Sequence, residues 1–177
     1  MKASVFVGTS LDGFIARQGG TFDFLFAGGV EPEPHGFEEL LASVDALVMG
    51  RNTFDVVLAM PTWPYGSKPV YVLSSRPILS TPPDVAVERM SGTPSEVLVQ
   101  LSARGIQHVY VDGGLTIQAF LRARLIQSLT ISRVPVLIGS GIALFGAVDA
   151  DIPLRHIATR QLAGGLVQSE YVIEPAA

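Results

Sequence analysis

Glycine, hydroxyl and cationic residues follow apolar runs at several places in this chain, in patterns that suit a nucleotide. The first pattern is Gly50, Arg51, Asn52 and Thr53, directly after the apolar residues 46–49. A strand that passes through glycine into a helix leaves free N–H groups at the positive helix end, and Arg51 and Thr53 add a charge and a hydroxyl. This pattern predicts an anion site suited to a phosphate. The alternative is a tight turn at Gly50 with Arg51 as a solvated surface charge.

The second pattern is Ser74, Ser75 and Arg76, which follow the apolar run 70–73. At the carboxyl edge of an α/β sheet, such groups are placed to bind a ribose and the 2′-phosphate that distinguishes NADP from NAD. Two serines after a strand are also typical of an ordinary turn. Both interpretations remain open at this stage.

The third pattern is Gly113, Gly114, Leu115 and Thr116, after the run 109–112. Paired glycines without Cβ atoms let a pyrophosphate approach the backbone, and Thr116 could cap the helix or bond a phosphate. No G-x-G-x-x-G motif follows this strand, so the standard Rossmann fingerprint is absent and a generic Gly-Gly turn is the alternative.

Asp112 precedes these glycines, on the side of an α/β sheet where ligands bind. A carboxyl group there could donate or relay a proton to a ring nitrogen beside the hydride acceptor, especially if partial burial raises its pKa. The alternative is a carboxylate at a helix N-terminus, stabilised by free N–H groups.

The elements that must position these residues follow from the apolar pattern. Short runs rich in Val, Ile and Leu alternate with helical stretches, which indicates an α/β protein. We expect strands at 3–8, 46–49, 70–73, 108–111, 128–137 and 166–173, and helices at 37–41, 52–59, 94–104 and 116–123, with Thr93 as the N-cap of the third helix. Because no strong helix separates the last two strands, an antiparallel end to a mostly parallel sheet is expected. No linker or repeat divides residues 1–177, so we predict a single domain.

Composition excludes several classes of partner. The formal net charge is -4 and the pI is about 5.3, which provides no basic field for nucleic acid or an anionic membrane. The chain has no Cys, hence no disulfide or Cys metal site, and no signal-peptide pattern, so we expect a cytoplasmic protein. Its mean hydropathy of +0.41 favours some apolar surface hidden in a homodimer.

Read in order, five segments of the chain resemble the dihydrofolate reductase-like superfamily. The similarity is greatest to its branch related to the reductase domain of the riboflavin-biosynthesis bifunctional deaminase-reductase. The segments are SLDGFIA (10–16), MGRNTF (49–54), VLSSR (72–76), VDGG (111–114) and VLIGSGIALF (136–145).

The resemblance implies an α/β fold with a mostly parallel central sheet of about eight strands, NADPH as cofactor, and Asp112 as the catalytic acid. It implies that the cofactor is bound by residues from four segments of the chain: Ile15 and Ala16; Gly50, Arg51, Asn52 and Thr53; Ser74, Ser75 and Arg76; and Gly113, Gly114, Leu115 and Thr116.

The chain departs from true dihydrofolate reductases where those enzymes carry an acid that anchors the pterin. Here Glu33-Pro34-His35-Gly36 occupies that neighbourhood and cannot be regular helix, while Glu38 and Glu39 come too late and suit the first turn of a helix. A zinc-binding deaminase partner is also missing from this sequence. The resemblance is therefore to a stand-alone relative.

The substrate contacts are expected from aromatic loops and nearby charges. Trp63 could stack on a flat heterocycle or close a core, and Asp23, between two Phe residues, could anchor a substrate. There is no obvious basic cluster for a ribose-phosphate tail, although Lys68 or Arg133 could contribute.

The leading hypothesis is an NADPH-dependent reductase of a flat pyrimidine or pteridine heterocycle, similar to 5-amino-6-(5-phosphoribosylamino)uracil reductase. The alternatives are dihydrofolate reduction and a nucleotide-binding homodimer without turnover.

Overall fold

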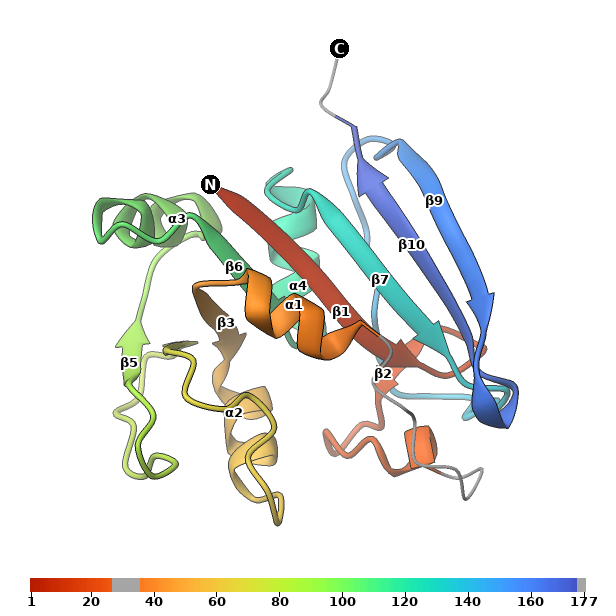
Figure 1. Cartoon of the computed structure of the whole chain (residues 1–177), viewed down its shortest axis with the longest axis horizontal. Helices are drawn as coiled ribbons and strands as arrows, with labels where there is room; N and C mark the ends of the chain where they lie inside the picture. Colours follow the sequence, from red (N-terminus) through yellow and green to blue (C-terminus); the bar gives the residue numbers. More distant parts are fainter. Residues whose placement is uncertain (27–35, 175–177) are drawn as a thin grey trace.

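The chain folds around one large sheet that carries helices on both faces. The computed structural model describes residues 1–26 and 36–174, and within them this sheet has eight strands in the order β5-β4-β3-β6-β1-β7-β10-β9 (Figure 1). In chain order the strands are β1 (Lys2–Thr9), β3 (Ala46–Gly50), β4 (Val70–Leu73), β5 (Val87–Met90), β6 (His108–Asp112), β7 (Ser128–Arg133), β9 (Leu154–Gln161) and β10 (Val167–Ile173). A second sheet pairs β2 (Phe14–Ala16) with β8 (Ile142–Ala143).

The strands from β5 to β7 are all parallel, whereas β10 runs antiparallel to β7 and β9 antiparallel to β10. This arrangement confirms the expected α/β class and the antiparallel end of the sheet. The helices are α1 (Phe37–Ser43), α2 (Arg51–Leu58), α3 (Pro94–Ala103) and α4 (Gly114–Arg122), with two short 3-10 helices, η1 (Asp23–Phe26) and η2 (Ala163–Gly165). None of the helices in the described residues is long and apolar enough to cross a membrane.

Two separate cores lie on the two faces of the sheet, because side chains alternate along each strand. Along β3, Ala46 and Val48 join one core with α3 and α4, whereas Leu47 and Met49 join the other with α1 and α2. Figure 1 shows α1 and α4 on opposite faces of the sheet. Strands buried on both faces need apolar residues at every position, which explains why 46–49 read as one continuous run.

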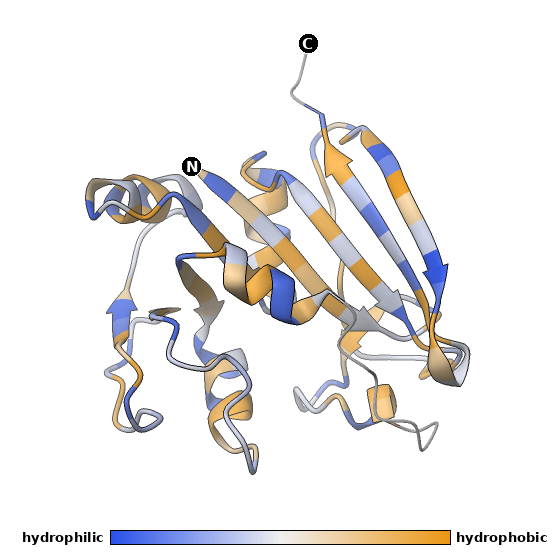
Figure 2. Ribbon diagram, in the orientation of Figure 1, coloured by the Kyte–Doolittle hydropathy of each residue, from blue (hydrophilic) through white to orange (hydrophobic). Residues whose placement is uncertain are grey.

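The two strands at the edges of the sheet were not predicted from the sequence. Neither β5 nor β9 is a continuous apolar run, since the edge of a sheet faces solvent and takes charged residues (Figure 2). The strand expected at 128–137 ends at Arg133 instead, because Pro135 has no N–H to donate to a neighbouring strand. Thr93 caps α3 as expected, with Glu96 completing a capping box.

Candidate active site

The three sequence patterns meet at one edge of the sheet. Strands β4, β3 and β6 are neighbours and parallel, so their carboxyl ends lie side by side. The register pairs Gly50 with Leu73 and Met49 with Asp112. The structure therefore brings together the residues that follow these strands, although they are far apart in the sequence.

Two helices begin at this edge without a side-chain cap. The N-caps of α2 and α4 are Gly50 and Gly113, and neither residue has a side chain that caps the first N–H groups of its helix, in contrast to Thr93 at the start of α3. The first N–H groups of a helix need partners and its N-terminus carries partial positive charge. This edge consequently presents two neighbouring helix ends suited to a pyrophosphate.

The glycines at these helix ends allow the two loops to interlock. A Cβ atom on Gly50 would lie 2.9 Å from Thr116 Oγ1, and one on Gly113, where φ is +94°, would overlap Thr53 Oγ1. Each glycine thus accommodates the threonine of the other helix. Thr116 is buried by this contact, whereas Thr53 stays half-buried and lines a cavity.

A cavity of about 240 Å³ lies at this edge, on the face of the sheet covered by α1 and α2. Its lining is mainly apolar and aromatic, with contributions from Phe6, Phe22, Phe37, Tyr65 and Tyr110. Seven of the predicted site residues also line it: Ile15, Ala16, Asn52, Thr53, Asp112, Gly113 and Gly114. The structure thus joins the predicted catalytic acid to both glycine-containing loops and to β2.

Asp112 is held by hydrogen bonds to both of its carboxyl oxygens. Tyr65 Oη donates to Oδ2 over 2.7 Å, and the Gly113 N–H donates to Oδ1 over 2.7 Å. Burial raises the pKa of Asp112 above its ordinary value, although the Tyr65, Gly113 and Tyr110 hydrogen bonds oppose that rise. A half-buried carboxyl group with a raised pKa, facing a cavity, has the properties of a general acid.

Tyr65 contacts Asp112 but was not predicted as a site residue from the sequence. It is 47 positions from Asp112 in the sequence, and its loop was noted only as a possible stacking surface. The side chain is buried, and burial together with the Asp112 charge raises the pKa of its hydroxyl well above the ordinary value. Tyr65 therefore acts as a hydrogen-bond donor to Asp112 rather than as an acid in its own right.

The structure gives the predicted cations different environments. Arg51 donates through Nε to the Asp55 carboxylate (2.7 Å) and through Nη1 to the Pro77 carbonyl (2.7 Å), and only 18% of its side chain is exposed. It is therefore not a solvated surface charge. Arg76 is exposed, and within the described part of the chain its guanidinium has no hydrogen bond or ion pair. Ser74 Oγ accepts from the Arg76 N–H (3.0 Å), which closes the turn after β4.

Seven of the predicted cofactor residues do not line the cavity, among them Gly50 and Thr116, which pack against each other where α2 and α4 begin. Leu115 is 69% exposed on the surface of α4, and Arg51, Ser74, Ser75 and Arg76 lie around the ends of β3 and β4, along the edge from Asp112. These positions suit the part of a dinucleotide that extends away from the reacting ring.

The two residues predicted to contact substrate are not brought into the cavity. Asp23 is paired through both oxygens with Arg17, at 2.8 and 3.1 Å, and 63% of its side chain is exposed. Trp63 does not line the cavity; it packs edge-on against Phe54 and Tyr65 and so helps to hold the Tyr65 ring in place.

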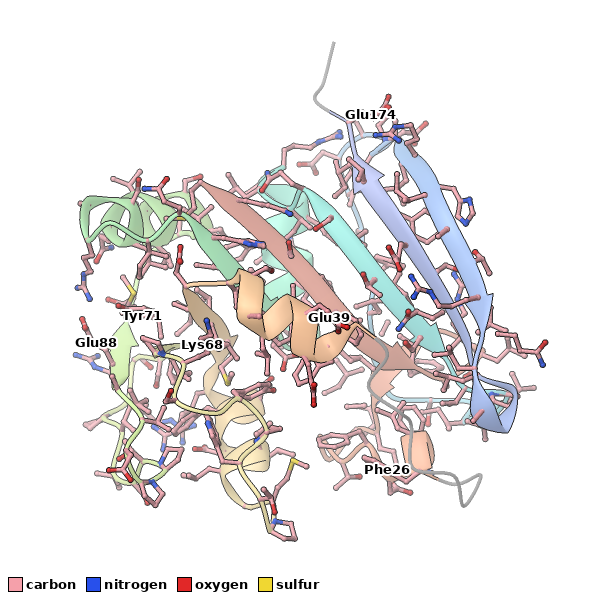
Figure 3. The ribbon with its side chains drawn as sticks, in the orientation of Figure 1. Phe26, Glu39, Lys68, Tyr71, Glu88 and Glu174 are labelled. Atoms are coloured by element: carbon pink, nitrogen blue, oxygen red, sulfur yellow. The ribbon has the colours of Figure 1, made fainter. Side chains whose placement is uncertain are left out.

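Neither of the two residues considered for a phosphate tail lines the cavity, and one of them, Arg133, is the last residue of β7. Lys68 donates to the Val44 carbonyl (2.6 Å), just before the start of β3 and not at its carboxyl end (Figure 3). The helix that precedes β3 presents Phe37 to the cavity, while Glu38 and Glu39 line a neighbouring one. Glu33, Pro34 and His35, in the neighbourhood where a pterin-anchoring acid would stand, lie outside the described residues.

Comparison with known proteins identifies a family model and similar chains that cover nearly all of this sequence. The family described as RibD C-terminal domain matches residues 2–168. The chain is 29% identical over 173 residues to "Uncharacterized protein YwjB" of Bacillus subtilis (strain 168), covering 97% of each chain. It is 37% identical to the crystal structure of "Putative riboflavin biosynthesis protein" from Shewanella sp. PV-4, with a TM-score of 0.90 and coverage of 99% and 100%.

A further comparison shows the fold alone. Dihydrofolate reductase from Enterococcus faecalis, complexed with NADP(H) and RAB-propyl, has a TM-score of 0.65 at 15% identity, covering 98% of this chain and 97% of that one. The fold is dihydrofolate reductase-like, as the resemblance implied.

Proposed function

Because this chain belongs to the RibD C-terminal domain family, we propose that it is an NADPH-dependent oxidoreductase that reduces a flat nitrogen heterocycle of pyrimidine or pteridine type. The observation that carries this proposal is the meeting of two uncapped helix ends with the half-buried acid Asp112 around one apolar cavity. The first feature suits the phosphates of a dinucleotide, and the second suits proton delivery beside a hydride acceptor.

The hydrogen-bond donors and the cation at this edge of the sheet fit the phosphates of NADPH. The N–H groups at the starts of α2 and α4, with Thr53, would hold the pyrophosphate, and the unpaired Arg76 would contact the 2′-phosphate. When bound, NADPH supplies the hydride that reduces the substrate. The family and the NADP(H) complex of the similarly folded dihydrofolate reductase support this choice of cofactor.

The protein's own contribution would be proton delivery and exclusion of water. Asp112, whose pKa is raised by burial, would carry a proton on one carboxyl oxygen and donate it to a ring nitrogen of the substrate. Tyr65 and the Gly113 N–H would fix the plane of that carboxyl group. The aromatic lining would stack on a flat ring and keep water away from the reacting atoms.

Reduction of dihydrofolate is less well supported, because α1 contributes Phe37 to the cavity and no carboxylate. We also propose a cytoplasmic homodimer. The edge strand β9 is exposed and carries Leu154 and Ile157, and Val167 begins the adjoining β10, so a second copy could cover this apolar surface.

The proposed function is tested by measuring NADPH oxidation against pyrimidines, pterins, flavins and quinones, together with NADPH affinity. We expect NADPH to bind and a pyrimidine or pterin to be reduced. Tight NADPH binding without oxidation by any compound would favour the nucleotide-binding alternative, and failure to bind NADPH would reject both.

A further inference from the structure

The charges around the cavity indicate what kind of substrate it can take. Among the described residues that line it, Asp112 is the one charged side chain, and there is no Lys, Arg or His. We propose that the substrate is a small uncharged heterocycle that carries no phosphate or carboxylate tail. This inference rests on the proposed reductase function, and it separates this chain from reductases of phosphoribosyl-substituted uracils.

The cations nearest to the cavity along the chain are already engaged. Arg17 follows the lining residue Ala16, and its guanidinium makes two hydrogen bonds to Asp23. Arg51 precedes the lining residue Asn52 and is bound to Asp55 and to a backbone carbonyl. A phosphate at the cavity would therefore have to compete with an existing carboxylate for either guanidinium.

A tail that extended past Phe6 would meet an acidic surface. Phe6 also lines a larger neighbouring cavity of about 760 Å³, whose other lining residues include Glu38, Glu39 and Glu170. Arg160, the one cation among the described residues of that lining, is ion-paired with Glu170. Glu39 is visible on α1, above this face of the sheet, in Figure 3. A phosphate placed there would face carboxylates without a free cation, which disfavours an anionic tail.

The undescribed residues 27–35 cannot reverse this balance with a strong cation. Their sequence contains Glu31 and Glu33 and no Lys or Arg. This conclusion comes from composition alone and does not depend on where these residues lie.

The size of the cavity points the same way. At about 240 Å³ it is smaller than the ~300–1,000 Å³ typical of pockets for drug-sized ligands, and it must also admit the reactive ring of the cofactor. Burying an unpaired phosphate or carboxylate beside Asp112 would cost far more free energy than the stacking of a ring on Phe6, Phe37 and Tyr65 contributes. The cavity therefore suits a bare ring, with Asp112 contacting its polar edge.

Two ligand pairs test this inference: a free base against its ribose-phosphate derivative, and two pterins that differ in one charged substituent. We would measure dissociation constants by calorimetry, with the protein saturated with NADP⁺, for 5-aminouracil against 5-aminouridine 5′-monophosphate and for 6-methylpterin against pterin-6-carboxylate. We expect the neutral member of at least one pair to bind, and to bind at least about tenfold tighter than its anionic partner. Tighter binding of either anionic member, or no binding by either neutral compound, would overturn the inference.

A variant that adds a cation tests the electrostatic reason. Met60 is half-buried and lines the cavity, so Met60→Lys places an ammonium group there, and Met60→Gln is the matched neutral control. We expect Met60→Lys to tighten binding of the anionic compounds at least about tenfold while Met60→Gln does not. If a folded Met60→Lys protein, verified by its melting temperature, leaves anion affinity unchanged, the lack of a cation is not what excludes anions.

These measurements separate this inference from the proposed reductase function, because binding does not require turnover. Neutral compounds that bind preferentially but never oxidise NADPH would reject the reductase function and retain the charge selectivity. Oxidation of NADPH by the anionic member alone would support the reductase function and reject the charge selectivity.

Discussion

Replacing Asp112 by Asn removes the proposed proton donor while keeping its shape. The Asn oxygen can still accept the Gly113 N–H, and its amide can donate to Tyr65, so NADPH affinity should stay close to wild type. General acid catalysis contributes about 100-fold or more, so turnover of the substrate found in the NADPH panel should fall by at least that factor, about 2.7 kcal/mol of activation free energy. The wild-type decline in rate as pH rises through the raised pKa of Asp112 should disappear in the variant.

The same pKa determines the sign of the stability change. A carboxyl pKa that is higher in the folded protein contributes stability below the unfolded pKa, and this contribution is lost as pH rises through the folded pKa. Across that interval the unfolding free energy of wild type relative to Asp112→Asn should therefore fall as pH rises, by at most about 1.4 kcal/mol per pH unit for one proton, and its melting temperature should fall with it.

Asp45→Asn is the matched control for this experiment. Like Asp112, Asp45 accepts two hydrogen bonds, here from the backbone N–H groups of Gln107 and His108, but it precedes β3 and so lies at the opposite edge of the sheet. Those hydrogen bonds lower its pKa, so its stabilising effect is lost as pH falls, the opposite direction to Asp112. Asp45→Asn should leave turnover unchanged.

The alternative for Asp112 makes a different prediction. If it only stabilises the start of α4, where the Gly113 N–H is bonded, Asp112→Asn should cost about 0.3–1 kcal/mol of stability and leave the rate intact. An unchanged turnover number, with retained NADPH affinity, would refute the catalytic role.

Three further predictions test the rest of the site. Arg76→Ala should weaken NADPH binding by about 1–3 kcal/mol and leave NADH nearly unchanged, whereas Arg122→Ala at the other end of α4 should affect neither; equal losses for both cofactors would remove Arg76 from the 2′-phosphate role. Gly113→Ala should lower the melting temperature more than Gly13→Ala, since both have positive φ but only the Gly113 Cβ would collide with Thr53; similar losses would show that backbone strain alone matters. Sedimentation should give a dimer at micromolar concentration, and a monomer there would contradict the proposed homodimer.

The central strands were predictable because each is buried on both faces and leaves a continuous apolar run in the sequence. Strands β3, β4 and β6 were found within one residue of their observed ends, and so the polar residues that follow them were correctly assigned to strand ends. Edge strands carry no such signal, since half of their surroundings are solvent, and β9 was missed for this reason.

The sequence by itself determined which residue types stand at the ends of buried strands: the glycines that cap α2 and α4, the hydroxyl of Thr53 and the carboxyl of Asp112. Local rules suffice there, because a strand, its turn and the next helix are consecutive in the chain. Only the tertiary structure decided which side chains meet. It paired Tyr65 with Asp112 and Asp23 with Arg17, and it placed no cation among the described residues that line the cavity. Contacts between distant segments depend on how the helices pack on the sheet. The local sequence around each residue does not indicate which distant residue it will contact.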